Sequence, residues 1–450
     1  MSQPTYFSGE EMRRIAERVL GLSGAEQARV NIVSGLQGNT RFAVNQISTA
    51  GDVVNAQLVV TSAFGRRVAS ATSNGFDDDS LRRVVETSER LARLVPENPE
   101  YLGELGGQQY PEVSAFFETT AALDAAARAA AVEEVTRRAR ERGLVATGFL
   151  PFQVGSQAVA TSRGLFAYGT ATQAAFTTTV RTPDGSGSGW AGTSVHDWSH
   201  VDAGALAGRA IDKAIRSRDP RPVEPGRWTV ILEPTAVANM VGLMVQQMSA
   251  RAADEGRSFF SRQGGGNRIG ESFLDDRISI HSDPADPQIL SPAFTNEGLP
   301  NRRTVWVENG TLASLIYDRF WARRQQREPT GFPAGFAMSG GDATIDDMIA
   351  STERGLLVTR LWYIRPVDPR TILFTGLTRD GTFLIEDGSI SHAVQNLRWN
   401  ESPVSILNGI RMMGRPERVS ASESGDVGPA VIVPPLKVEG FNFTSVSDAV

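Results

Sequence analysis

The 450-residue sequence contains no cysteine, which excludes disulfides, thiolate zinc sites and a cysteine nucleophile and fits a reducing compartment. Lysine occurs only at Lys213 and Lys437, so nearly all positive charge is arginine. These arginines are scattered, and a biased composition explains their number without any function. The formal net charge of −6 argues against non-specific binding of nucleic acid, which requires a basic surface.

Long apolar runs are missing as well. No stretch approaches the roughly eighteen uninterrupted apolar residues of a membrane span, and residues 1–21 lack the apolar core of a secretory signal. Instead, Ser8 and Glu11 have the spacing of a capping box, which predicts that a helix begins there. We therefore expect a soluble, cytoplasmic protein whose mature chain starts close to this helix.

The length and the order of patterns predict two domains with an α+β fold. A chain of this length exceeds the roughly 250–300 residues at which one hydrophobic core stops growing. Residues 1–218 alternate between strand and helix patterns, whereas residues 227–450 consist mainly of short, turn-bounded strand patterns. Three prolines lie in the segment between them, residues 219–226. We expect a mixed α/β N-terminal domain, a proline-rich linker and a C-terminal domain dominated by antiparallel sheet.

Local patterns give more specific expectations. We expect residues 29–35 and 39–49 to form a strand pair, and Leu91 to point inward from a helix over residues 78–94. A second helix is expected over residues 121–142. Asn-Gly at residues 309–310 and Asp-Gly at residues 387–388 predict hairpin turns, and residues 162–164 are expected to form a turn between two strands.

Residues 230–248, VILEPTAVANMVGLMVQQM, predict a buried strand followed by a helix. Pro234 suits the first turn of a helix, where its missing N–H is not needed. The residues at spacings of three and four form one apolar stripe: Val237, Met240, Val241, Met244 and Met248. Nothing on this stripe titrates or binds a metal tightly, so core packing is the simplest interpretation.

The four histidines offer few alternatives for chemistry. His196 and His200 are four residues apart, and on a helix they could begin a zinc site. The surrounding sequence instead indicates a loop entering a helix, with no third ligand at a telling distance, which favours surface or capping roles. His281 and His392 stand alone, and structural roles are expected for both.

Two further clusters have structural interpretations. The loop formed by Gly264, Gly265, Gly266 and Asn267 could cradle a phosphate, but it lacks the lysine and hydroxyl of a nucleotide-binding loop, which favours a flexible loop. The acidic run at residues 77–79 lies where a helix begins, and carboxylates there complement the helix dipole. A cation site remains the alternative for that run and for residues 275–276.

The order of segments resembles the TldD/PmbA (TldD/TldE) family of bacterial and archaeal zinc peptidases. The resemblance covers nearly the whole chain and is clearer in the C-terminal half. It is carried by RFAVNQIS, GRRVASATSNGFDDDSLRRVVETSERLARLVPENP, GSGWAGTS, TNEGLP, VENGTLASLIYD, IASTERGLLVTRLWYIRPVDPRT, FLIEDGSISHAV and PPLKVEGFNF.

The resemblance also implies where a catalytic site would lie. Catalytic members carry HExxxH on the helix after Pro234, and its functional places fall on Asn239, Met240 and Met244 here. A cysteine ligand near the C-terminus would fall at about Ser420. Asn, Met, Met and Ser provide neither a zinc site nor a general base. We expect no zinc on this chain, and the vacated positions are candidates for lining a substrate cavity.

This pattern resembles the TldE (PmbA) type of subunit. The resemblance implies a heterodimer with a TldD-like, HExxxH-bearing subunit that holds zinc, the two chains enclosing peptides or unfolded segments. Two alternatives stay open: a homodimeric peptide-binding or scaffold protein without proteolysis, and an independent enzyme that uses His196 and His200. No role in nucleic-acid or membrane binding is expected.

Overall fold

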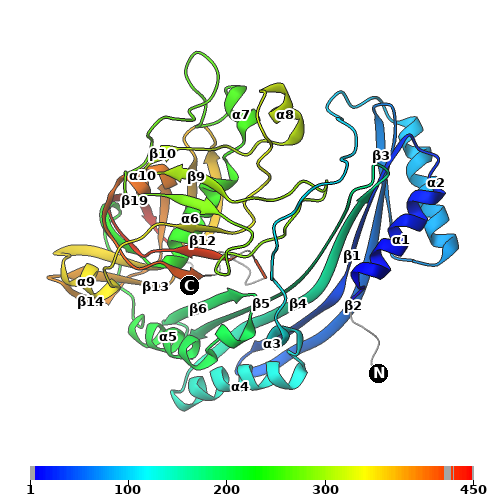
Figure 1. Ribbon diagram of the computed structural model, residues 1–450. Helices are drawn as coiled ribbons and strands as arrows, with labels where there is room; N and C mark the ends of the chain where they lie inside the picture. Colours follow the sequence, from blue (N-terminus) through cyan, green and yellow to red (C-terminus); the bar gives the residue numbers. More distant parts are fainter. Residues whose placement is uncertain (1–5, 420–426, 429, 448–450) are drawn as a thin grey trace.

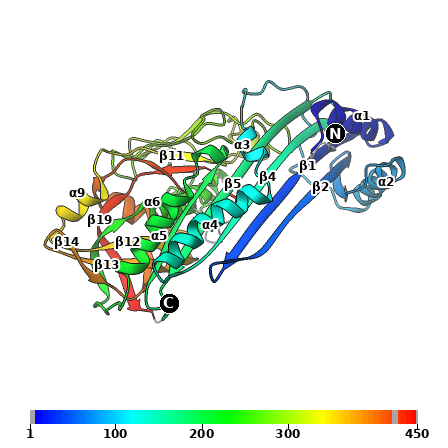
Figure 2. The same cartoon turned by 90° about the horizontal axis from the view of Figure 1, so that it is seen from below.

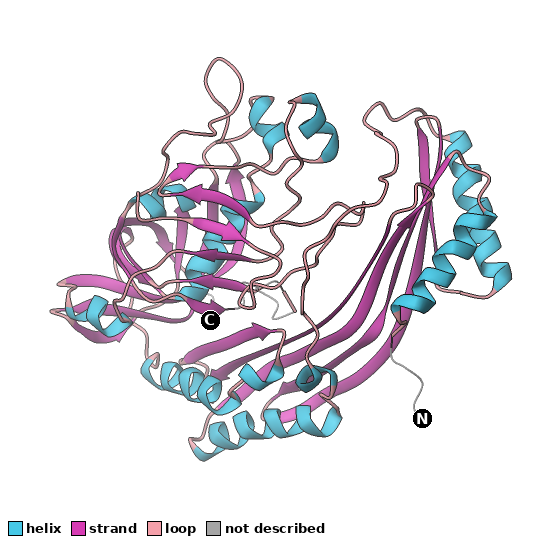
Figure 3. Cartoon of the chain, in the orientation of Figure 1, coloured by secondary structure: helices cyan, strands magenta, loops and turns pink. Residues whose placement is uncertain are grey.

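The computed structural model describes residues 6–419, 427–428 and 430–447, and it divides into two strand-rich parts (Figures 1 and 3). The first is a long, curved antiparallel sheet with helices on its outer face. The second lies on the inner face of that sheet and contains two further sheets. The predicted α+β class is confirmed.

The first sheet has six strands, each antiparallel to its neighbours. In spatial order they are β3 (Arg67–Ser73), β2 (Gln46–Phe64), β1 (Gln27–Ala43), β4 (Val145–Thr161), β5 (Phe166–Arg181) and β6 (Ser188–Val195). The glycine- and serine-rich sequence GSGWAGTS thus contributes the edge strand β6.

The prediction that residues 29–35 and 39–49 pair as two strands is wrong. Residues 27–43 form one continuous strand, and the chain reverses at Val44 and Asn45, whose φ angles are 52° and 59°. Positive φ at both central residues fits a tight hairpin turn. Gly35 does not break the strand because it faces Gly155, where the two backbones approach closely.

Two groups of helices cover the outer face of this sheet (Figure 2). They are α1 (Gly9–Leu22), α2 (Asp78–Leu94), α3 (Glu118–Ala121), α4 (Ala125–Glu141), η1 (Trp198–His200) and α5 (Ala203–Arg216). The capping box of Ser8 and Glu11 is confirmed. Leu91 was expected inside but is exposed, and the helix expected over residues 121–142 begins only after the Asp124 cap.

The second part contains two sheets. One has the order β10 (Thr311–Leu312), β9 (Thr304–Glu308), β8 (Ile280–Ser282), β11 (Phe336–Met338), β18 (Val431–Val433) and β17 (Glu417–Val419). The other has the order β12 (Arg354–Asp368), β7 (Gly226–Leu232), β19 (Leu436–Val446), β15 (Leu397–Glu401), β13 (Leu373–Glu386) and β14 (Ser389–Ala393), with β16 (Ile410–Met413) on β19. Because β12 also pairs with β13, this path closes into a ring.

Short helices connect these strands: α6 (Pro234–Gln246), α7 (Ala250–Asp254), α8 (Arg319–Arg324), α9 (Ile345–Ala350) and α10 (Pro403–Asn408). The hairpin turns predicted at residues 309–310 and 387–388 are confirmed by positive φ angles. Antiparallel pairs dominate, as expected, although β7 with β12 and β11 with β18 are parallel. The predicted domain boundary at residues 219–226 lies between α5 and β7, and the domain limits stay a prediction.

Among the described residues, none of the helices combines the length and the apolar character that crossing a lipid bilayer requires.

Partly buried polar contacts join the two parts. Lys213 of α5 lies 2.5 Å from the carboxylate of Glu233, which precedes α6. Ser188 of β6 donates a hydrogen bond of 2.6 Å to Asp380 of β13, and Asp380 pairs with Arg360 of β12 at 3.2 Å. Both charged side chains of that pair are almost fully buried. These contacts fix the second part against the inner side of the first sheet.

This network predicts the effect of removing one charge. Asp380 has a φ of 56°, a conformation that asparagine tolerates, so Asp380→Asn keeps the backbone geometry. Losing the charge beside buried Arg360 is expected to lower the free energy of unfolding by about 3 kcal/mol in urea titrations. Asp387→Asn, at an exposed turn with a φ of 48°, is the matched control and should change stability by less than about 0.5 kcal/mol. Equal effects of the two substitutions would contradict this account.

Candidate functional site

The positions where the family resemblance places a zinc site are packed inside the second part. Met240 and Met244 are 1% and 0% exposed and belong to its main hydrophobic cluster. Asn239 is also buried and donates a hydrogen bond of 3.3 Å to the carbonyl of Leu361. These side chains do not fit a zinc ion, since a thioether and an amide are poor zinc ligands. Ser420 lies outside the described residues.

His196 is held by main-chain carbonyls of both parts. Its Nδ1 lies 2.7 Å from the Thr172 carbonyl of β5, and its Nε2 lies 3.2 Å from the Leu290 carbonyl. Burial lowers the pKa of the imidazole below its ordinary value. Because each ring nitrogen faces a carbonyl, neither is available to a metal. His200 lies exposed in η1, in agreement with the expected surface role, whereas His196 is partly buried between the two parts and is neither a surface nor a capping residue.

The other candidates also have structural surroundings. In the glycine loop, Asn267 donates a hydrogen bond of 2.7 Å to Asp254. Asp77 caps α2, and the Arg277 guanidinium lowers the pKa of Asp275 to about 2. Among the described residues, no group of three or more histidine, aspartate or glutamate side chains is placed to hold a metal ion.

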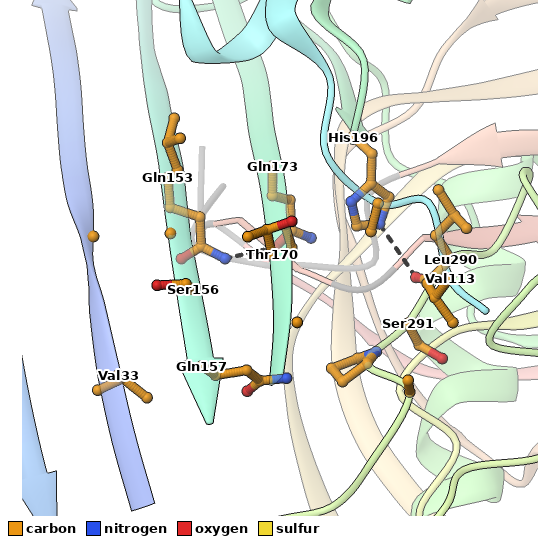
Figure 4. A pocket seen from close by; sticks show the side chains of 18 of the residues that line it. Val33, Val113, Gln153, Ser156, Gln157, Thr170, Gln173, His196, Leu290 and Ser291 are labelled. Atoms are coloured by element: carbon orange, nitrogen blue, oxygen red, sulfur yellow. Dashed lines mark hydrogen bonds between the residues drawn. The ribbon is translucent and has the colours of Figure 1, made fainter. Parts of the chain in front are cut away.

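A cavity of about 940 Å³ lies between the inner face of the first sheet and the second part (Figure 4). One side of it is formed by β1, β2, β4 and β5, including Gln153, Gln157 and Gln173. The facing side is formed by loops of residues 290–294, 332–334 and 427–428 and by the segment 110–115. Asn239, Met240 and Met244 are not among its lining residues. This cavity is the candidate functional site.

Comparison with known protein families identifies the family of this chain. The family profile described as PmbA/TldA metallopeptidase C-terminal domain matches residues 225–445, and the profile described as the central domain of the same metallopeptidases matches residues 110–218. The chain belongs to the PmbA/TldD family. The family predicted from the order of sequence segments is therefore confirmed.

Curated relatives of this PmbA/TldD chain include two archaeal proteins. A metalloprotease of Methanothermobacter thermautotrophicus is 24% identical over 254 residues, 52% of this chain and 52% of that protein. A zinc metalloprotease TldD homolog of Saccharolobus solfataricus is 23% identical over 243 residues, 48% of this chain and 52% of that protein. The matched region thus spans about half the length of these relatives.

Solved structures share the fold of this PmbA/TldD chain over nearly its whole length. TldE from Thermococcus kodakarensis has a TM-score of 0.83 at 18% identity and covers 96% of this chain and 99% of its own. A Thermotoga maritima protein described as a putative modulator of a DNA gyrase has the same TM-score at 17% identity, covering 96% and 100%. At these identities the likeness shows the fold.

Sequence reasoning did not identify the cavity. Its polar residues are scattered over four strands, and they gather only through long-range pairing, as between Gln37 and Gln153, which lie 116 positions apart in the sequence. A signal was available in the alternation of Gln153, Gly155 and Gln157, since residues two apart in a strand share one face. Polar side chains on a face that is covered by a second part of the chain indicate an interface that contains water, as a cavity does.

His196 gives this interface a pH dependence. The pKa of His196 is lower in the folded state than in the unfolded chain. The stability that neutral His196 contributes is therefore fully present above the ordinary imidazole pKa of about 6.5, and it is lost as the pH falls through the folded pKa. Between about pH 7.5 and about pH 5, the free energy of unfolding should fall more for the unmodified chain than for His196→Gln, by at most about 1.4 kcal/mol per pH unit. His200→Gln is the exposed control and should follow the unmodified chain. Parallel pH profiles for His196→Gln and the unmodified chain would contradict this assignment.

Proposed function

We propose that this chain is a non-catalytic, TldE-like subunit of a zinc metallopeptidase and that it helps to enclose peptides or unfolded segments for a TldD-like partner. In this proposal the partner carries HExxxH and the zinc, and this chain contributes a substrate-holding wall. The cytoplasmic location expected from the cysteine-free sequence belongs to the same proposal.

The burial of α6 is the observation that carries the proposal. The helix follows a central strand, as the family pattern requires, but the residues at the functional places face apolar neighbours. A hydrolytic zinc site needs three ligands, an open position for water and a base. Met240 and Met244 are sealed from water and cannot take part in such a site. The large cavity elsewhere in the chain supports a role in holding substrate.

A free strand edge supports the assignment of a partner chain. β3 pairs with β2 only over residues 58–64, so the outer edge of β2 over residues 46–57 has no neighbouring strand in the described chain. Val53 and Val54 are 64% and 61% exposed on the two faces of this edge. The segment lacks proline, lysine and arginine, which commonly protect such edges from pairing. We propose that an extended strand of the partner subunit pairs with this edge.

A homodimeric peptide-binding protein is the alternative function. The same edge and cavity would serve it, with a second copy of this chain as the partner. Asp52 lies near the centre of residues 46–57, and a symmetric antiparallel pairing about this centre brings two such carboxylates together. The Asp52 carboxylate is bound at 2.7 Å by Arg128, which weakens this repulsion. The heterodimer is favoured because the family resemblance supplies a zinc-bearing partner.

Coexpression with an HExxxH-bearing relative tests the proposal. We expect a 1:1 complex that contains zinc and cleaves casein, while this chain alone is free of zinc and inactive. A zinc-free homodimer that captures no relative would support the alternative. Zinc-dependent cleavage by the isolated chain would contradict both functions.

The partner surface has its own prediction. Val53→Lys combined with Val54→Lys should reduce capture of the partner at least about tenfold in size-exclusion and pull-down measurements, because charged side chains on an edge oppose strand pairing. Leu94→Lys is the matched control, since Leu94 is 76% exposed at the end of α2 and lies away from this edge. An intact complex with the double variant would place the partner elsewhere.

A further inference from the structure

The strand register arranges the inner face of the first sheet into three rows that cross the strands. Residues that pair in antiparallel strands point to the same face. The first row contains Val53, Gln37, Gln153 and Gln173; the second contains Asn55, Gly35, Gly155 and Ala171; the third contains Gln57, Val33, Gln157 and Gly169. All of these residues except Val53 line the cavity.

The middle row projects little from the sheet because Gly35 and Gly155 have no side chain and that of Ala171 is small. A Cβ atom on Gly35 would lie 2.5 Å from the Val154 carbonyl oxygen, and one on Gly155 would lie 2.7 Å from the Ser34 carbonyl oxygen. Neither position can therefore carry a side chain. The rows on either side lie about 13 Å apart, four residues along a strand. The result is a groove across the sheet, with glycines in its floor and glutamines along its sides.

The ends of this transverse groove differ. At β5 it is closed by the segment 110–115, where the Thr172 N–H donates a hydrogen bond of 2.9 Å to the Ala115 carbonyl. At β2 it ends at exposed Asn55, on the strand edge that has no neighbour in the described chain. Strands about 4.8 Å apart make the distance from β2 to β5 about 14 Å, the length of about four extended residues.

The groove is chemically neutral. Among the described residues that line the cavity, the acidic and basic side chains are those of Glu112 and His196. Gln153 donates a hydrogen bond of 2.9 Å to Gln173, and Gln173 donates in turn to the Gly428 carbonyl, which fixes the orientation of both amides (Figure 4). A charged ligand side chain over the three rows would lose water without gaining an opposite charge, because none of the row residues is charged and Glu112 belongs to the facing segment 110–115.

We infer that the transverse groove binds an extended polypeptide segment with uncharged side chains and recognises it through its main chain. Glutamine amides offer both donors and acceptors, which match the N–H and C=O groups of a peptide. The three rows offer amides and small side chains without an aromatic surface of the kind on which nucleobases stack, and the aromatic residues Tyr110, Phe294 and Phe332 belong to the facing side of the cavity. The inference deepens the proposed function by naming its substrate class and the residues that select it.

Direct binding to the full chain tests this inference without any peptidase assay. The probe is a fluorescein-labelled dodecapeptide of alanine, serine, threonine and glycine, followed by fluorescence anisotropy. Matched peptides contain four glutamates, four lysines, or alternating N-methylated residues that lack N–H donors. We expect the neutral peptide to bind at least about tenfold more tightly than each matched peptide. Equal affinities, or displacement by equimolar maltohexaose, would overturn main-chain recognition.

Variants locate the binding site. Ala171→Leu adds a side chain to the middle row at an exposed position and should weaken binding at least about tenfold. Gln153→Met with Gln157→Met keeps side-chain length but removes the amides, and should weaken binding about tenfold. Gln108→Met, at an exposed loop residue outside the cavity, is the control. Unchanged binding by stably folded Ala171→Leu and by the double variant would overturn the groove as the site.

The outcome is separable from that of the proposed function. Peptide binding that depends on Ala171, together with failure to form a zinc-containing complex, would leave the groove in place and remove the peptidase role. An active, zinc-containing complex would keep the peptidase role. If peptide binding by the isolated chain then did not depend on Ala171, the groove would be removed as the binding site.

Discussion

Continuous pairing of β1 with both of its neighbours is the constraint on which the rest of the structure depends. β1 pairs with β2 from Gln27 to Ala43 and with β4 from Arg29 to Phe42. A slip of one residue would exchange the two faces of the sheet. The apolar residues would then leave the helices, and the glutamines would leave the cavity. The close approach of Gly35 and Gly155 favours this register, because other residues would collide there.

The two faces of this sheet have different tasks. The outer face packs against α1 and α2 at one end and against α4 and α5 at the other, which stabilises the long strands. The inner face stays polar and is covered by the second part through a cavity. The Lys213–Glu233 ion pair and the hydrogen bond from Ser188 to Asp380 hold the two parts together, so the width of the cavity is set by contacts outside it. The residues that line the cavity and the residues that hold the two parts together are therefore different.

Sequence reasoning succeeded where the signal is local. The Ser8 capping box, the helix over residues 78–94 and the hairpin turn at residue 388 each depend on residues a few positions apart. It failed where long-range packing decides. Gly35 looked like the end of a strand, because the partner that tolerates it, Gly155, is 120 residues away. The transverse groove could not be predicted for the same reason, since its rows require the register of four strands.

Photo-cross-linking within the proposed zinc-containing complex tests the central proposal most directly, namely that this chain holds substrate while its partner performs the chemistry. A neutral peptide carrying one photoreactive residue would be trapped with the complex and the attachment sites mapped by mass spectrometry. The account predicts attachment on β4 and β5 near Gln153 and Gln173, with no attachment along α6. Attachment confined to the partner, or to α6 of this chain, would contradict it.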